Sequence, residues 1–157
     1  KCLKASLDDD PRIFFVEGYL TTEEMRGLLN TADAYVSLHR SEGLGLGMAE
    51  SMYLGKPVIG TAYSGNMEFM NIENACLVKF RLIPVADGDY PYHSGQVWAE
   101  PDITEAAAWM LRLADEPELC VEIGHHAAAY MRKFHSREVM GQAIRTRITE
   151  ISNSFAR

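Results

Sequence analysis

The stretch SEGLGLGMAE, residues 41–50, decides how the chain around it folds. Residues 34–38, just before it, are short, apolar and partly β-branched, as in a buried strand, and residues 48–54 favour a helix. The stretch is therefore predicted to be a loop between a strand end and a helix start. Gly43, Gly45 and Gly47 leave the backbone open to a ligand, and the first N–H groups of the helix favour an anion. A diphosphate fits such a loop.

Two carboxylates of this stretch, Glu42 and Glu50, are candidate ligand-binding groups. They lie eight positions apart, so they do not share a helix: Glu42 belongs to the loop and Glu50 to the helix. A glutamate after a strand end points into the crevice where open α/β sheets bind ligands, and carboxylates accept hydrogen bonds from sugar hydroxyls. The alternative is that Glu42 interacts with the helix dipole and that Glu50 is a solvated helix residue. The spacing alone leaves both interpretations open.

Outward from this loop, strands alternate with helices. Strands are predicted at residues 13–16, 34–38, 58–61 and 75–80, and Thr21 and Glu24 predict a capping box that begins a helix reaching residue 32. The α/β order predicts a Rossmann-like, doubly wound parallel sheet with helices on both faces. Residues 1–10 favour a helix, and further helices at 103–114, at 117–133 and after Ser136 are expected to pack on the sheet.

Two later segments do not follow the alternation of strands and helices. Residues 81–101, RLIPVADGDYPYHSGQVWAEP, predict a long ordered loop without regular structure. It is either a surface excursion packed by its aromatic side chains or a lid or wall on the acceptor side. The last helix carries an apolar stripe that must pack on something, formed by Met140, Ile144, Ile148 and Ile151.

Length and composition indicate one domain. The chain has 157 residues, 47% of them hydrophobic, and 15 basic against 22 acidic residues give a formal charge of −7, which argues against nucleic acid or an anionic membrane as partner. No apolar run is long enough for a transmembrane segment. The three cysteines lack paired spacing, so we expect reduced thiols and no metal site. Reduced thiols favour a cytoplasmic location, and a parent protein could attach the chain peripherally to the inner membrane. Because the sequence lacks an initiator methionine, we expect a fragment.

Several motifs together resemble one enzyme family. RSEGLGL at 40–46, AESM at 49–52 and GKPVIG at 55–60 resemble the signature of family-4 retaining glycosyltransferases with the GT-B fold, in which two glutamates are separated by seven residues. The family more often has Phe and Pro where Leu44 and Gly47 stand. GYLT at 18–21, SGN at 64–66 with Glu68, and PEL at 117–119 extend the resemblance over most of residues 12–134.

The resemblance implies a role for each matching position. Glu42 would contact the donor sugar as the catalytic residue, and Glu50 would bind the ribose. The backbone of residues 43–46 would face sugar and phosphate, and the complete predicted donor-binding set is Gly43, Leu44, Gly45, Leu46, Glu50, Arg40, His39, Tyr19 and Leu20. His39 closes the strand before the loop, and Arg40 pairs either with a phosphate or with a neighbouring carboxylate.

The resemblance also implies what the chain does. Residues 1–157 would be the nucleotide-sugar-binding, C-terminal half of a longer enzyme, without its first strand and its N-terminal domain. The parent would transfer a sugar from a nucleoside diphosphate to an acceptor, in glycan or polysaccharide synthesis, with no further cofactor. We expect the acceptor to be held mainly by the missing domain and the chain alone to be inactive. The alternatives are a non-catalytic nucleotide-sugar-binding or protein-interaction module, or a related epimerase or phosphorylase.

Overall fold

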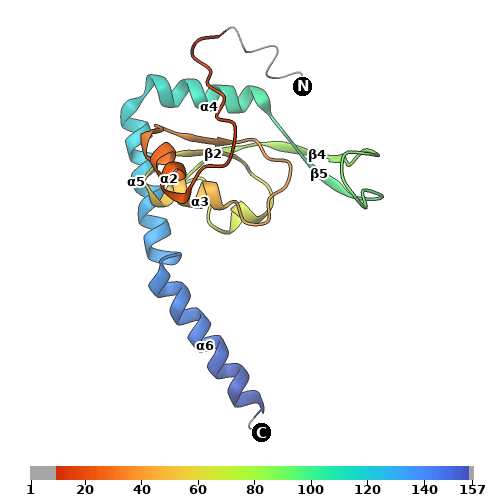
Figure 1. Cartoon of the computed structure of the whole chain (residues 1–157), viewed down its shortest axis with the longest axis vertical. Helices are drawn as coiled ribbons and strands as arrows, with labels where there is room; N and C mark the ends of the chain where they lie inside the picture. Colours follow the sequence, from red (N-terminus) through yellow and green to blue (C-terminus); the bar gives the residue numbers. More distant parts are fainter. Residues whose placement is uncertain (1–9, 156–157) are drawn as a thin grey trace.

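The computed structural model describes residues 10–155, and its centre is a three-stranded parallel sheet (Figure 1). The strands β1 (Tyr35–Ser37), β2 (Val58–Thr61) and β3 (Cys76–Val78) lie in the order β1-β2-β3. Tyr35 is in register with Val58, and Ile59 with Cys76. Three of the four predicted strands are confirmed. The helix predicted for residues 1–10 lies almost entirely outside the described residues.

Helices cover both faces of this sheet, as predicted. Every residue of the central strand β2 is buried, and its side chains alternate between two hydrophobic clusters. Val58 packs with α3 (Leu46–Tyr53) and the second half of α5 (Pro117–Phe134), whereas Ile59 packs with α4 (Ile103–Asp115) and the first half of α5. Pro117 occupies the first turn of α5, the position that proline favours in a helix.

The first described helix, α2 (Thr22–Thr31), begins at the predicted capping box. The backbone N–H of Glu24 donates to the Thr21 hydroxyl at 3.2 Å, and the N–H of Thr21 donates to the Glu24 carboxylate at 2.7 Å. Two helix-end donors are thereby satisfied reciprocally. The sequence predicted this helix start correctly because the contacts of a capping box join residues only three positions apart.

The strand predicted at residues 13–16 is wrong. This segment has no strand structure, and all four of its residues are exposed. An extended segment becomes a strand only when a neighbouring strand pairs with it, and within residues 10–155 no strand lies beside this one. The apolar residues of the segment indicate strand propensity, but propensity alone does not supply a partner.

The prediction of a loop without regular structure at residues 81–101 is wrong at both ends of this range, whereas residues 85–96 lie outside helices and strands. This region forms β4 (Phe80–Pro84) and β5 (Val97–Pro101), an antiparallel hairpin that projects to one side of the molecule (Figure 1). Phe80 pairs with Pro101 and Pro84 with Val97. Each proline is the last residue of its strand, and both strands of this two-stranded sheet are edge strands, where a missing N–H is tolerated.

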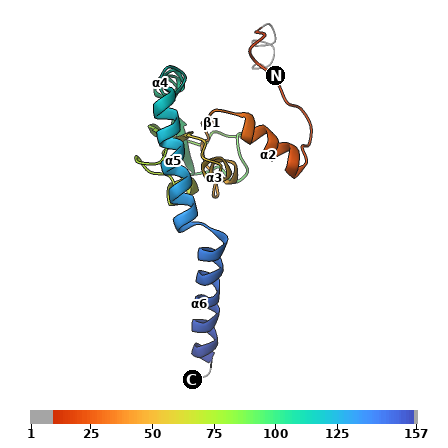
Figure 2. The same cartoon turned by 90° about the vertical axis from the view of Figure 1, so that its left-hand side faces the viewer.

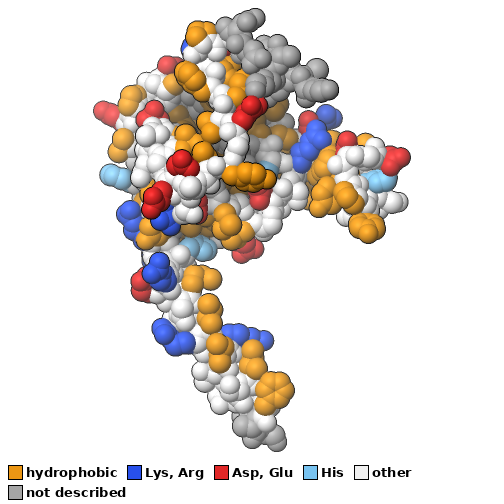
Figure 3. Space-filling view, viewed as in Figure 1, with side chains coloured by type: hydrophobic (Ala, Val, Ile, Leu, Met, Phe, Trp, Pro, Cys, Tyr) orange, Lys and Arg blue, Asp and Glu red, His pale blue; other side chains and the backbone are white. Residues whose placement is uncertain are grey.

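The C-terminal helices differ in how they pack. The prediction that they pack on the sheet is confirmed for α4 and α5 but not for α6 (Arg137–Phe155), which has no buried residue and leads away from the sheet (Figure 2). The N–H of Val139 donates to the Ser136 hydroxyl at 3.3 Å, which confirms the predicted cap. Hydrophobic side chains line one side of α6 (Figure 3). Within residues 10–155, no helix is both long and apolar enough to cross a bilayer.

The packing of α3 against α5 depends on a close approach of two glycines. A Cβ on Gly124 of α5 would lie 2.1 Å from the carbonyl oxygen of Gly55, just after α3. Gly55 itself adopts a positive φ of 78° at the end of the helix, a conformation that favours glycine. The two helices can therefore meet at this distance only without a side chain at position 124.

Gly124→Ala should destabilise the fold by about 1–3 kcal/mol, the usual cost of forcing an extra methyl group into a packed contact. The measurement is the free energy of unfolding from chemical denaturation. Gly141→Ala is the matched control, because a Cβ there meets nothing within 4 Å and α6 should gain helix propensity. Equal stability of the Gly124→Ala variant and the wild type would contradict this account of the packing.

Candidate functional site

Two loops meet at the carboxyl edge of the sheet, and His39 joins them. The loop after β1 carries His39, whose Nε2 lies 3.0 Å from the carbonyl oxygen of Tyr63 and 3.1 Å from Oδ1 of Asn66. Both partners belong to the loop after β2, which includes the short 3-10 helix η1 (Gly65–Glu68). Because both partners are acceptors, Nε2 carries a proton, and Nδ1 lies at hydrogen-bond distance from the Ser37 hydroxyl oxygen, at 3.1 Å. Both ring nitrogens are therefore occupied by protein groups. Contact of His39 with a ligand stays a prediction.

The backbone of Glu42 is held by the second loop. Its N–H donates to the Ser64 hydroxyl at 3.1 Å, and its carbonyl oxygen accepts from that hydroxyl at 2.5 Å and from the N–H of Gly65 at 3.1 Å. Ser64 has a φ of 82°, which is uncommon for a residue with a side chain and costs conformational energy. The Glu42 carboxylate is exposed and has no hydrogen bond or ion pair within residues 10–155.

A glycine contact permits this arrangement. A Cβ on Gly65 would lie 2.0 Å from the carbonyl oxygen of Gly43, so no other residue fits there without moving one of the loops. Gly43 itself is different, because a Cβ on it would meet nothing within 4 Å. Gly65 therefore serves the packing of the two loops, whereas Gly43 presents open backbone to solvent.

The N-terminus of α3 opens beside this loop. Gly45 is the N-cap residue, with a φ of 86° and no side-chain cap, and the first helical hydrogen bond runs from the N–H of Ala49 to its carbonyl oxygen at 3.0 Å. The N–H groups of Leu46, Gly47 and Met48 make no hydrogen bond within the described part of the chain. No acidic residue occupies the first turn. The helix dipole and these three donors together favour an anion.

Tyr35 connects the two glutamates electrostatically. Burial raises the pKa of Tyr35, and the negative charges of Glu42 and Glu50 raise this pKa further. Tyr35 also lies under the first turn of α3, because a Cβ on Gly47 would be 2.6 Å from its hydroxyl oxygen. The Glu50 side chain is exposed and, like that of Glu42, unpaired within residues 10–155. The fold thus brings both predicted carboxylates near one phenol group.

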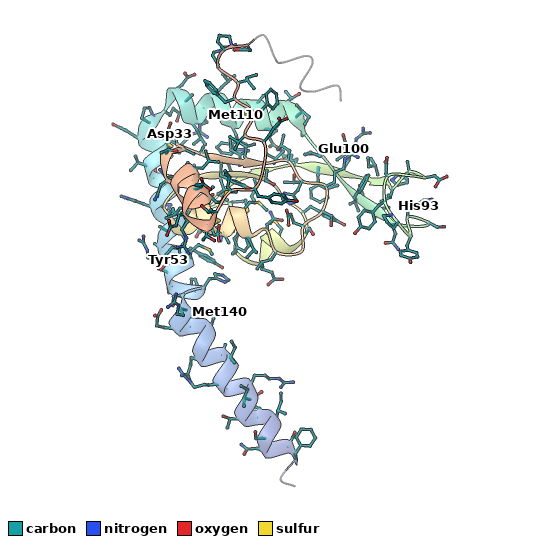
Figure 4. All side chains as sticks on the ribbon, in the orientation of Figure 1. Asp33, Tyr53, His93, Glu100, Met110 and Met140 are labelled. Atoms are coloured by element: carbon teal, nitrogen blue, oxygen red, sulfur yellow. The ribbon has the colours of Figure 1, made fainter. Side chains whose placement is uncertain are left out.

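Arg40 contacts the β4–β5 hairpin. Its guanidinium forms an ion pair with Glu100 at 2.8 Å and lies 4.8 Å from the centre of the Trp98 ring. Its carbonyl oxygen accepts from the N–H of Ala99 at 2.9 Å. In Figure 4, Glu100 lies at the base of the hairpin and His93 near its tip. Of the two pairings predicted for Arg40, the structure contains the one with a carboxylate.

The other predicted donor-binding residues differ in how far the structure places them from the Glu42 loop. The Tyr19 side chain is fully exposed just before α2, with no hydrogen bond or ring contact within residues 10–155, and Leu20 is half-buried. Leu44 and Leu46 are both exposed beside the α3 N-terminus. Donor contacts of these four residues stay predictions. Sequence reasoning missed Tyr35 and Ser64 as site residues, although Ser64 belongs to the quoted SGN motif.

A separate pocket of about 740 Å³ lies between β3 and the helices α4 and α5. Its lining includes Asn74, Leu77, Trp109, Ile123, His126 and Phe134. None of its lining residues belongs to the Glu42 loop or to α3. The pocket and the carboxyl edge of the sheet are therefore two different places on the molecule.

Comparisons with known proteins agree with this geometry. Residues 3–81 match the profile of the family described as "Glycosyl transferases group 1". The trehalose synthase of Pyrococcus horikoshii is 29% identical over 110 residues, which are 70% of this chain and 21% of that protein. The crystal structure of HepE from Anabaena, in complex with UDP and glucose, superposes with a TM-score of 0.70 at 19% identity and covers 94% of this chain and 34% of its own. TarM superposes with a TM-score of 0.61 at 21% identity, over 90% and 25% of the two chains.

The fold and the site therefore define an α/β domain with an uncapped helix N-terminus at the carboxyl edge of its sheet. Because the profile matches half of its length, the chain belongs to the group 1 glycosyl transferases. Its fold is shared with parts of HepE and TarM, and the profile match confirms the family resemblance carried by SEGLGLGMAE. The chain spans about a fifth to a third of the length of these relatives.

The electrostatic link between Tyr35 and the two glutamates is testable. Glu42→Gln and Glu50→Gln should each lower the raised pKa of Tyr35, because each removes a negative charge that opposes tyrosinate formation. The tyrosinate absorbance, taken as a difference from Tyr35→Phe, reports this pKa. Since the pKa is raised in the folded state, its contribution to stability is present below the ordinary value of 10.0 and is lost as the pH rises through the raised pKa. A pKa unchanged in both glutamate variants would contradict the geometry.

Proposed function

We propose that this chain is the donor-binding domain of a retaining glycosyltransferase that moves a sugar from a nucleoside diphosphate to an acceptor. The carrying observation is the uncapped N-terminus of α3 beside two exposed glutamates. Its three N–H groups and both carboxylates have no hydrogen-bond or ion-pair partner among residues 10–155. The N–H groups suit a diphosphate, and carboxylates suit hydroxyl groups. A nucleoside diphosphate sugar carries both kinds of group in one molecule.

Each part of the site then has one task. The N–H groups at the start of α3, with the backbone of residues 43–46, bind the diphosphate and stabilise the charge that develops on it as the sugar leaves. Glu50 binds the ribose hydroxyls. Glu42, whose backbone is held by Ser64, directs its carboxylate to the donor sugar. The complex of HepE with UDP and glucose supports a donor of this chemical class.

Transfer needs more than this domain. The relatives are three to five times as long as the part that this chain matches, and we propose that the acceptor binds mainly to a second domain of the parent enzyme. The parent would act in glycan or polysaccharide synthesis. The chain by itself would bind the donor without turning it over, because the acceptor and part of the leaving-group stabilisation would be missing.

Calorimetric titration of the chain with UDP-, GDP- and dTDP-sugars tests the proposal. At least one of them should bind, and Glu42→Ala should weaken binding of that sugar nucleotide about tenfold while leaving the free nucleoside diphosphate nearly unaffected. Glu50→Ala should weaken both ligands to a similar extent, because both contain the ribose.

The control is Glu122→Ala, which removes an exposed helical glutamate of α5, far in sequence from the loop, and should change neither affinity. If the wild-type chain bound none of these nucleotides, the interaction-module alternative would replace the donor-binding proposal. Equal losses in all three variants would show that the effect is one of net charge.

A further inference from the structure

Arg40 joins the loop that carries Glu42 to the β4–β5 hairpin. Three consecutive residues of β5 contact Arg40: Trp98 through its ring, Ala99 through its N–H and Glu100 through its carboxylate. Side chains two positions apart on a strand point to the same face. The ring of Trp98 and the carboxylate of Glu100 therefore lie on one face of the hairpin, and the guanidinium lies against both.

The chemistry of arginine suits this position. A planar guanidinium can lie flat on an aromatic ring and also form an ion pair with a carboxylate, whereas the compact ammonium of lysine has no flat face to stack. The side chains of Arg40 and Glu100 are 43% and 30% exposed, so solvent weakens the ion pair. The backbone hydrogen bond from Ala99 adds a contact that is independent of charge.

The second loop of the site contacts the same hairpin. The ring of Tyr63, after β2, lies 5.0 Å from the ring of Phe80, the first residue of β4. The Glu42 loop is in turn bonded to that second loop through Ser64 and Gly65. Both loops that form the site thus rest on the base of the hairpin, one through Arg40 and one through Tyr63.

We propose that Arg40 is a positioning residue, which joins the β4–β5 hairpin to the Glu42 loop and thereby sets the affinity for the nucleotide-sugar donor. In this arrangement the guanidinium acts through the loop backbone, and its charge is paired with Glu100 instead of with the diphosphate. The hairpin becomes part of the donor site without touching the donor. The inference rests on the proposed function for its ligand.

Titration with UDP and UDP-glucose separates positioning from direct phosphate contact, with the proposed donor class represented by these two probes. Glu100→Gln and Arg40→Lys should each lower the affinity for UDP-glucose about three- to tenfold. The double variant should bind as well as either single variant, because all three break the same contact between Arg40 and Glu100. If Arg40 instead bound the diphosphate, Glu100→Gln would release its guanidinium and would leave affinity unchanged or raise it, which would overturn the inference.

The matched control is Glu116→Gln. Arg112 forms an ion pair with Glu116 at 2.9 Å and lies 5.4 Å from the Trp109 ring, so this trio has the same chemistry at the end of α4. This change should leave donor affinity as in the wild type. A loss equal to that of Glu100→Gln would assign the effect to general stability and would also overturn the inference.

Hydrogen exchange without ligand gives a readout that does not depend on the proposed function. In Glu100→Gln and Arg40→Lys, peptides covering residues 40–47 and 97–101 should exchange faster than in the wild type, whereas helix α5 should be unchanged. Unchanged exchange in residues 40–47 would overturn the inference even if the chain binds donor. Faster exchange together with no binding of either probe by the wild type would contradict the proposed function and leave the link through Arg40 supported.

Discussion

The close approach of Gly65 to Gly43 is the constraint on which the site depends. With no side chain at position 65, the loop after β2 comes near enough for Ser64 and Gly65 to hydrogen-bond the backbone of Glu42. These bonds fix where the loop after β1 enters α3, and Gly45 then begins the helix without a side-chain cap. The uncapped N-terminus of α3 and the position of Glu42 both depend on this close backbone contact between Gly65 and Gly43.

The site places groups that suit phosphate and groups that suit hydroxyls close together. Backbone N–H groups at the start of α3 suit phosphate oxygens, whereas the carboxylates of Glu42 and Glu50 suit hydroxyl groups and repel phosphates. The chain carries a formal charge of −7, so its long-range field does not attract an anionic ligand. Binding of a nucleoside diphosphate must therefore rely on short-range contacts, and small shifts of the loop backbone should have large effects.

Local signals made much of this structure predictable, and non-local contacts account for the rest. The Thr21 capping box and strand β2 lie where the sequence placed them, because a cap needs only its own turn and a buried central strand has a continuous apolar run. The hairpin was missed because Pro84 and Pro101, which end its strands, suggested a loop. Likewise, the roles of Tyr35 and Ser64 come from partners seven or more positions away, which no local pattern reveals.

The central claim is that the first turn of α3 binds the diphosphate. It is tested most directly by amide nitrogen–proton correlation spectra recorded while UDP is added to the chain. The account predicts that the largest chemical-shift changes fall on the backbone amides of residues 43–48. The amide protons of Leu46, Gly47 and Met48 should move to higher chemical shift as they donate hydrogen bonds to the phosphate oxygens. Shifts centred on the pocket around Trp109 and His126, with the amides of residues 43–48 unchanged, would contradict it.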